Sequence, residues 1–174
     1  MIAIISGTNR NNSISLLVSK QIKKMLIDLH QEVLLVNLQE LPDDLIESSL
    51  YSNSGKNHKF NQLSDKIKEA DKLFFVIPEY NGSFPGVLKT FIDGLPYPSV
   101  VKGKKAAILG ISSGVMGSAL AISHFTDILN YLGCSVLATK PRITSIEKNF
   151  INNSFVDPFH NNLINSQLSE FLNF

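Results

Sequence analysis

The segment "LFFVIPEYNGSFPGVLKTFID", residues 73–93, decides the fold class. Its first five residues are all apolar, which is typical of a β-strand covered on both faces. A polar loop with an Asn81-Gly82 turn follows at once. Apolar residues then recur with a helical period at Leu88, Phe91, Ile92 and Leu95. A buried strand, a polar loop and a helix in this order form the repeating unit of a parallel α/β sheet.

The same unit recurs along the chain. Apolar runs predict five strands, at residues 2–6, 33–37, 72–77, 105–111 and 135–138. Helical periodicity alternates with them, over residues 14–29, 60–70, 88–95, 122–132 and 159–172. Five strands that alternate with five helices predict a doubly wound parallel sheet with right-handed crossovers. Because no repeat or low-complexity linker interrupts this pattern, we expect residues 1–174 to form a single domain, with 39–59 as an irregular surface excursion.

The composition restricts the classes of function. The chain has 174 residues, of which 44% are hydrophobic and 18% charged, and its net charge is +1. This balance gives no electrostatic field for holding nucleic acid or an anionic membrane surface. No apolar run approaches the roughly 18 residues of a membrane span. The single cysteine, Cys134, excludes an intrachain disulfide, so we expect a cytoplasmic protein in which this residue packs in the core.

The loop after the first strand has the features of a phosphate site. Ligands of doubly wound sheets bind at the carboxyl ends of the strands, and "SGTNRNNSIS", residues 6–15, leads from such an end into a helix. A helix start offers unpaired N–H groups and the positive end of the helix dipole, which stabilise a phosphate. Side chains add further donors for the same ligand: Thr8, Arg10, Ser13 and Ser15. The alternative is an ordinary capping loop, with Asn12 or Ser13 as the N-cap.

Two common nucleotide motifs are absent. No two glycines are spaced as G-x-G, so the dinucleotide fingerprint is missing, and no Gly-Lys-Ser/Thr of a nucleoside triphosphate loop occurs. A polar loop with one glycine that can hold a single phosphate therefore favours a mononucleotide.

The loops after the third and fourth strands suit a flat ligand. In the loop that begins at Pro78, Gly82 and Gly86 permit a close backbone approach, and Tyr80 supplies an amphipathic ring. A plain strand–helix connection explains the Asn-Gly turn, but not the density of polar residues around it. The third loop, "SSGVMGS" at residues 112–118, has small residues against which the edge of a ring can lie.

Together, "SGTNRNNSIS", "PEYNGSFPGVLKTFID" and "SSGVMGS" resemble the motifs of the NAD(P)H-dependent FMN reductases, a flavodoxin-like family that includes quinone, azo-dye and chromate reductases. The resemblance runs in order over roughly residues 2–135. It implies a flavodoxin-like α/β fold, with five parallel strands in the order 2-1-3-4-5 and helices on both faces. It also implies FMN as the cofactor, NAD(P)H as the co-substrate, and a homodimer or homotetramer.

The family pattern, carried over to this chain, implies a set of cofactor-binding residues. The FMN phosphate would be held by Thr8, Arg10, Ser13, Ile14 and Ser15. The isoalloxazine ring would be lined, largely through backbone groups, by Pro78, Glu79, Tyr80, Asn81 and Gly82, and its other edge by Ser113, Gly114 and Gly117. The alternative for Glu79 is that it takes part in a contact between subunits. Two positions depart from the family: Ser15 stands where Asn is usual, and Ser118, where a second Gly is common, would tighten the flavin edge.

The resemblance implies an oxidoreductase whose flavin carries the chemistry, so that neither a catalytic side chain nor a metal ion is needed. A reduced nicotinamide would give hydride to the flavin, and a small acceptor (quinone, flavin, azo compound or metal oxyanion) would then receive it in a ping-pong cycle. An FMN-binding electron carrier for protein partners is one alternative, which the net charge of +1 disfavours because such carriers usually have an acidic docking surface. A flavin-binding protein of low turnover is the other. Lys89 and Asp93, four residues apart on a helix, are expected to form an exposed ion pair.

Overall fold

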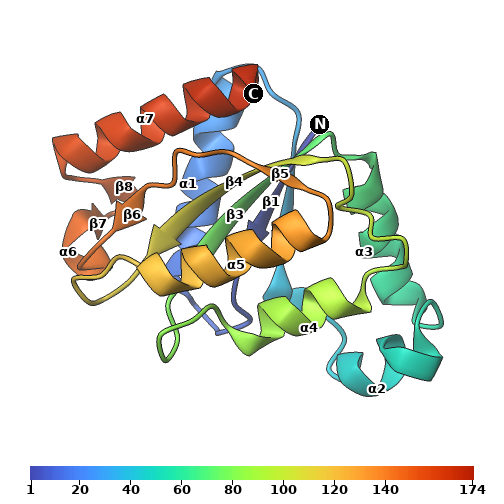
Figure 1. Ribbon diagram of the computed structural model, residues 1–174. Helices are drawn as coiled ribbons and strands as arrows, with labels where there is room; N and C mark the ends of the chain where they lie inside the picture. Colours follow the sequence, from blue (N-terminus) through green and yellow to red (C-terminus); the bar gives the residue numbers. More distant parts are fainter.

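The computed structural model describes residues 1–174, with a parallel sheet at its centre (Figure 1). Neighbouring strands follow the order β2-β1-β3-β4-β5, and every pair along this path is parallel. The five strands are β1 (Ile2–Ser6), β2 (Val33–Asn37), β3 (Lys72–Pro78), β4 (Lys105–Ile111) and β5 (Ser135–Val136). The flavodoxin-like order implied by the sequence resemblance is thus confirmed.

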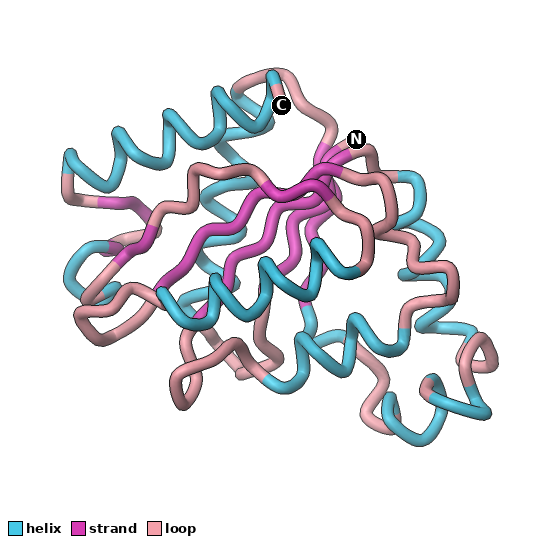
Figure 2. Tube along the Cα trace, viewed as in Figure 1, coloured by secondary structure: helices cyan, strands magenta, loops and turns pink.

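Helices cover both faces of the sheet, as Figures 1 and 2 show. One face is covered by α1 (Ile14–Asp28) and α7 (Pro158–Asn173), and the other by α3 (His58–Glu69), α4 (Gly86–Gly94) and α5 (Ala119–Tyr131). All five helices lie where the apolar periodicity predicts them. None of the helices is long and apolar enough to span a membrane.

Each face of the sheet has its own apolar core. On β3, Phe74 and Val76 pack toward α1 and α7, whereas Phe75 and Ile77 pack toward α3, α4 and α5. The Phe75 ring meets the Phe125 ring of α5 edge-on, with centroids 4.8 Å apart. Each large apolar side chain buried in this way contributes about 1.5–3 kcal/mol relative to exposure. Burial on alternating sides explains why the strand is apolar at consecutive positions.

The predicted fifth strand, 135–138, is wrong in extent. β5 ends at Val136, and a separate strand, β6 (Arg142–Ile143), resumes the pairing with β4 further along. The amide of Gln167, a fully buried residue of α7, lies between the two segments and donates hydrogen bonds to the carbonyls of Ile108 and Thr139, at 2.7 and 3.0 Å. A side chain thus replaces the missing part of the backbone ladder, which the apolar pattern of the strand does not reveal.

Two regions hold more structure than the sequence predicts. The excursion after β2 contains a 3-10 turn (Leu38–Glu40), α2 (Leu45–Ser49) and a second 3-10 turn (Tyr51–Asn53). It is anchored by three leucines buried in the core: Leu41, Leu45 and Leu50. Between β6 and α7 lie a short helix, α6 (Ile146–Asn149), and a hairpin of β7 (Phe150–Ile151) and β8 (Ser154–Phe155).

Candidate functional site

A cavity of about 450 Å³ opens at the carboxyl ends of the central strands. Three segments predicted from the sequence form most of its wall: residues 10–15 at the start of α1, 78–80 at the end of β3, and 111–113 at the end of β4. Ile146 and Glu147 of α6 complete it. The chain thus brings its three polar loops together at one end of the sheet, as the parallel topology requires.

The first loop presents unpaired hydrogen-bond donors. Ser13 is the N-cap of α1, and its hydroxyl accepts from the N–H of Leu16, which resolves the choice between Asn12 and Ser13. None of the backbone N–H groups of residues 11–15 donates to another protein atom. Arg10 forms no ion pair. This concentration of positive potential at a helix start is suited to an anion.

Gly7 lets the first loop pass close to β3. Its N–H donates to the carbonyl of Val76 at 2.9 Å, and a Cβ at this position would lie 2.7 Å from the same oxygen. Real Cβ atoms do not come so close to a backbone atom, so only glycine fits here without displacing the strand or the loop.

The second loop forms a tight turn over the strand end. Tyr80 and Ser83 exchange backbone hydrogen bonds at 2.8 and 3.0 Å, while Asn81 and Gly82 between them adopt positive φ angles of 52° and 74°. This is the geometry of a two-residue hairpin turn, for which Asn-Gly is the preferred pair. The N–H of Tyr80 is used inside the turn, whereas those of Asn81 and Gly82 have no backbone acceptor.

A side-chain hydrogen bond connects the first two loops. The hydroxyls of Tyr80 and Thr8 lie 2.9 Å apart, and Thr8 also accepts from the N–H of Arg10 at 3.3 Å. Thr8 is buried, so this pair fixes the phosphate-type loop against the turn. Nearby, Oε2 of Glu79 is buried in the cavity wall without a hydrogen-bond partner. A buried carboxylate oxygen without a donor is rare in folded proteins and suits a ligand that brings one.

The third loop is tightly crosslinked. The Ser112 hydroxyl donates to the carbonyl of Gly114 at 2.9 Å and accepts from the N–H of Gly117 at 3.0 Å. Gly117 packs on β6, where a Cβ would lie 2.7 Å from the Cβ of Arg142. Ser118 is fully buried, and its hydroxyl donates to the carbonyl of Ile77 at 3.1 Å. This serine therefore faces the sheet and does not tighten the edge of the cavity.

The structure brings most of the expected site residues to the cavity wall: Arg10, Ser13, Ile14, Ser15, Pro78, Glu79, Tyr80 and Ser113. Five residues lie outside the lining: Thr8, whose hydroxyl is 2.9 Å from that of Tyr80, and Asn81, Gly82, Gly114 and Gly117. The sequence reasoning missed Ile146 and Glu147. A four-residue helix has no detectable periodicity, so no local signal could have found them.

Glu147, in the cavity wall, has a clearly perturbed ionisation. The hydroxyl of Ser113 donates to its Oε1 at 2.5 Å. This hydrogen bond, followed by one from the backbone of Glu147, lowers the pKa of the carboxyl below its usual value. The cavity thus carries a negative charge on the wall formed by α6 as well as a positive one at Arg10.

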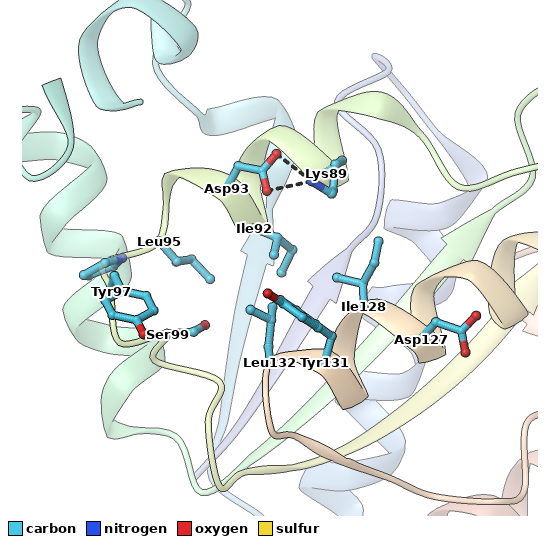
Figure 3. Close-up of a pocket in the computed structure, with 11 residues that line it drawn as sticks. Lys89, Ile92, Asp93, Leu95, Tyr97, Ser99, Asp127, Ile128, Tyr131 and Leu132 are labelled. Atoms are coloured by element: carbon cyan, nitrogen blue, oxygen red, sulfur yellow. Dashed lines mark hydrogen bonds and ion pairs between the residues drawn. The ribbon is translucent and has the colours of Figure 1, made fainter. Parts of the chain in front are cut away.

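A second cavity, of about 510 Å³, lies away from these loops, between α4 and α5 (Figure 3). Its wall is mostly apolar, and the rings of Tyr97 and Tyr131 beside it are 99% and 90% exposed. The Lys89 ammonium contacts both carboxylate oxygens of Asp93 at 2.8 Å at its rim, which confirms the expected ion pair. This cavity has none of the phosphate-type donors of the first.

The sheet order and the three loops define a flavodoxin-like protein with a candidate mononucleotide site. A family model described as NADPH-dependent FMN reductase matches residues 1–145. The chain therefore belongs to the NADPH-dependent FMN reductase family. The family is named for oxidoreductases that work with FMN and NADPH.

Individual relatives agree with this assignment. A 2-hydroxy-1,4-benzoquinone reductase of Burkholderia sp. is 43% identical over 84 residues, which are 47% of this chain and 45% of the relative. The matched segment thus spans about half the length of that relative. A quinone reductase of Escherichia coli K12 is 28% identical over 138 residues, or 78% of this chain and 72% of the relative.

Among solved structures, FerB from Paracoccus denitrificans, a flavoenzyme NAD(P)H:(acceptor) oxidoreductase, superposes with a TM-score of 0.78. The superposition has 26% sequence identity and covers 99% of this chain and 94% of that one.

Proposed function

We propose that the protein is an FMN-dependent NAD(P)H oxidoreductase that reduces a small acceptor in a ping-pong cycle. The observation that carries this proposal is the pairing, in one cavity, of unpaired N–H donors at residues 11–15 with a buried carboxylate oxygen of Glu79 that lacks a donor. The first suits a phosphate, and the second suits the hydroxyl or N–H of a polar organic ligand. A phosphorylated flavin has all of these groups.

The start of α1 would hold the phosphate. Arg10 supplies charge, the N–H groups of residues 11–15 supply oriented donors, and the hydroxyls of Ser13 and Ser15 lie in the same wall. The side chain of Ile14 closes the wall beside them. Thr8 acts from beneath, since its hydroxyl is bound to Tyr80 and to the N–H of Arg10.

The turn after β3 and the loop after β4 would border the ring. Pro78, Glu79 and Tyr80 line the cavity, and the free N–H groups of Asn81 and Gly82 are suited to an electron-rich ring edge. Ser113 lies opposite, with Gly114 and Gly117 in the same loop. These residues act by shape and hydrogen bonding rather than by acid–base catalysis.

When bound, FMN would supply the redox chemistry of hydride transfer between a reduced nicotinamide and the acceptor. The contribution of the chain is to orient the ring and to keep one surface open for stacking partners. A quinone is the acceptor that the relatives' names favour, since two of them are quinone reductases. Free flavin, azo compounds and metal oxyanions are further candidates.

We also propose a cytoplasmic homodimer or homotetramer. Support for association comes from the exposed aromatic rings of Tyr97 and Tyr131 beside the apolar cavity between α4 and α5 (Figure 3). Large apolar side chains clustered at a surface hollow are typical of subunit contacts. The molar mass in solution, measured by light scattering, tests this: a monomer at micromolar concentration contradicts it.

The experiment that tests the function is anaerobic stopped-flow reduction of the purified, FMN-loaded protein. Loss of flavin absorbance with NADH or NADPH, followed by its return on adding benzoquinone, supports the enzyme. Reduction by neither donor would favour an electron carrier or a flavin-binding protein of low turnover. A protein that is colourless and fails to bind added FMN would refute the flavin site itself.

A further inference from the structure

The cavity has a wall that the three sequence motifs do not supply. Ile146 and Glu147 belong to α6, at the left of Figure 1, which begins just beyond residues 1–145 of the family match. They line the same cavity as Arg10 and the start of α1. A carboxylate is the one charged group that this wall contributes.

Backbone and side-chain hydrogen bonds hold Glu147 in place. The N–H of Ser145 donates to the carbonyl of Gly114 at 3.1 Å, and the N–H of Ile146 donates to that of Ser112 at 3.0 Å. The Ser113 hydroxyl donates to the Glu147 carboxylate at 2.5 Å. Two backbone bonds and one charge-assisted bond therefore fix α6 to the third loop. The carboxylate faces the cavity as an ionised group, since its pKa is lowered.

A phosphate bound at the start of α1 would share one cavity with that carboxylate. A volume of about 450 Å³ corresponds to a sphere about 10 Å across, which is comparable to the Debye length at physiological ionic strength. Arg10 and the N–H groups of α1 attract a phosphate dianion, and Glu147 repels it. The repulsion does not act on an unphosphorylated flavin, whose hydroxyls and ring N–H can donate to a carboxylate instead.

We propose that Glu147 is a specificity-determining residue of the flavin site, whose charge reduces the preference for FMN over the unphosphorylated flavin. This inference rests on the proposed flavin-binding function. With the Glu147 charge, the site distinguishes FMN from riboflavin less strongly than the phosphate-type loop would without it. Ser113 is the positioning residue that fixes the carboxylate toward the cavity.

The test is a fluorescence titration of the flavin-free full-length protein with FMN and with riboflavin. The measured quantity is the ratio of the riboflavin Kd to the FMN Kd, because a change in the part of the site that both ligands share affects both Kd values alike and leaves the ratio unchanged. We expect Glu147→Gln to raise the ratio by about three- to tenfold, since the charge is at the surface and partly screened. Raising the salt concentration to about 0.5 M should reduce this difference between the variant and the wild type.

Glu170→Gln is the matched control. Glu170 on α7 also accepts a hydrogen bond from a hydroxyl, that of Thr139, but does not line the cavity, so its variant should keep the wild-type ratio. Glu147→Asp keeps the charge at this position and should stay within about twofold of the wild-type ratio. It also provides a test if Glu147→Gln does not fold: a shift in Glu147→Asp as large as the one expected for Glu147→Gln would mean that loop geometry rather than charge sets the preference, and would overturn the proposal.

An unchanged or lowered ratio in a folded Glu147→Gln variant would also overturn the inference, while leaving the proposed function intact. If the wild-type protein binds neither flavin, the proposed function fails and the inference fails with it. The two failures are therefore distinguishable in one set of titrations.

Discussion

Replacement of Arg10 by alanine separates recognition of the phosphate from recognition of the ring. Arg10 lines the cavity, forms no ion pair within the protein, and adjoins the unpaired N–H groups of residues 11–15. We expect Arg10→Ala to weaken FMN binding strongly and riboflavin binding hardly at all, because only FMN carries a phosphate.

The magnitude follows from the kind of contact and its exposure. A hydrogen bond that involves a charged group contributes about 1.5–3 kcal/mol. Arg10 is exposed, so screening by water and salt favours the lower part of this range, about 1.5–2 kcal/mol. This corresponds to a roughly 10- to 30-fold rise in the FMN Kd. The riboflavin Kd should change by less than about twofold.

The assay is titration of flavin-free protein at fixed ionic strength, followed by flavin fluorescence. Arg142→Ala is the matched control, because it removes the chain's other arginine, which is exposed and lies outside the cavity wall. Its Cβ, which packs against Gly117, is kept in alanine. Equal losses for both flavins, or an equal loss of FMN affinity in Arg142→Ala, would refute the role of Arg10 at the phosphate.

Three further predictions concern the framework of the site. Gly7→Ala should lower the free energy of unfolding in urea by about 1–3 kcal/mol, because the new Cβ would lie 2.7 Å from the Val76 carbonyl oxygen; a stability equal to wild type would contradict the close approach. Thr8→Val and Tyr80→Phe each remove one end of the 2.9 Å hydroxyl contact and should each cost about 0.5–1.5 kcal/mol. In the double variant the losses should be less than additive, and full additivity would mean that the two hydroxyls do not interact. Burial raises the pKa of the Cys134 thiol to about 11, so alkylation at pH 8 should be at least about a hundredfold slower in the folded protein than in urea; similar rates would disprove the burial.

The sequence predicts the strands that are covered on both faces and fails where a side chain replaces the backbone ladder. β1, β3 and β4 are continuous apolar runs because each lies in the middle of the sheet between two cores. The fifth strand is split because the amide of Gln167, some thirty residues later in the chain, donates hydrogen bonds to the carbonyls of Ile108 and Thr139. A polar residue on a helix gives no sign that its amide will enter a sheet, so a local pattern could not predict this interruption.

The candidate site could be predicted as far as it is made of loops at strand ends. Topology alone brings residues 6–15, 78–82 and 112–118 together, since parallel strands place their carboxyl ends at one edge. Glu147 lines the same cavity only because β6 pairs in parallel with β4 and α6 follows β6 in the chain. The pairing of β6 with β4 depends on the register between two segments that are distant in the chain, and neither periodicity nor a motif encodes this register.

Ser118 shows how a departure from the family pattern is accommodated without touching the site. Its backbone is left-handed, with φ at 66°, which costs a residue other than glycine about 1 kcal/mol. The buried hydrogen bond from its hydroxyl to the Ile77 carbonyl contributes a comparable 0.5–1.5 kcal/mol, roughly offsetting the strain. The serine Cβ also needs the space above Gly110, where a Cβ would lie only 2.9 Å away. A serine at 118 is therefore tolerated because position 110 is glycine and the Ile77 carbonyl lies within hydrogen-bonding distance of its hydroxyl.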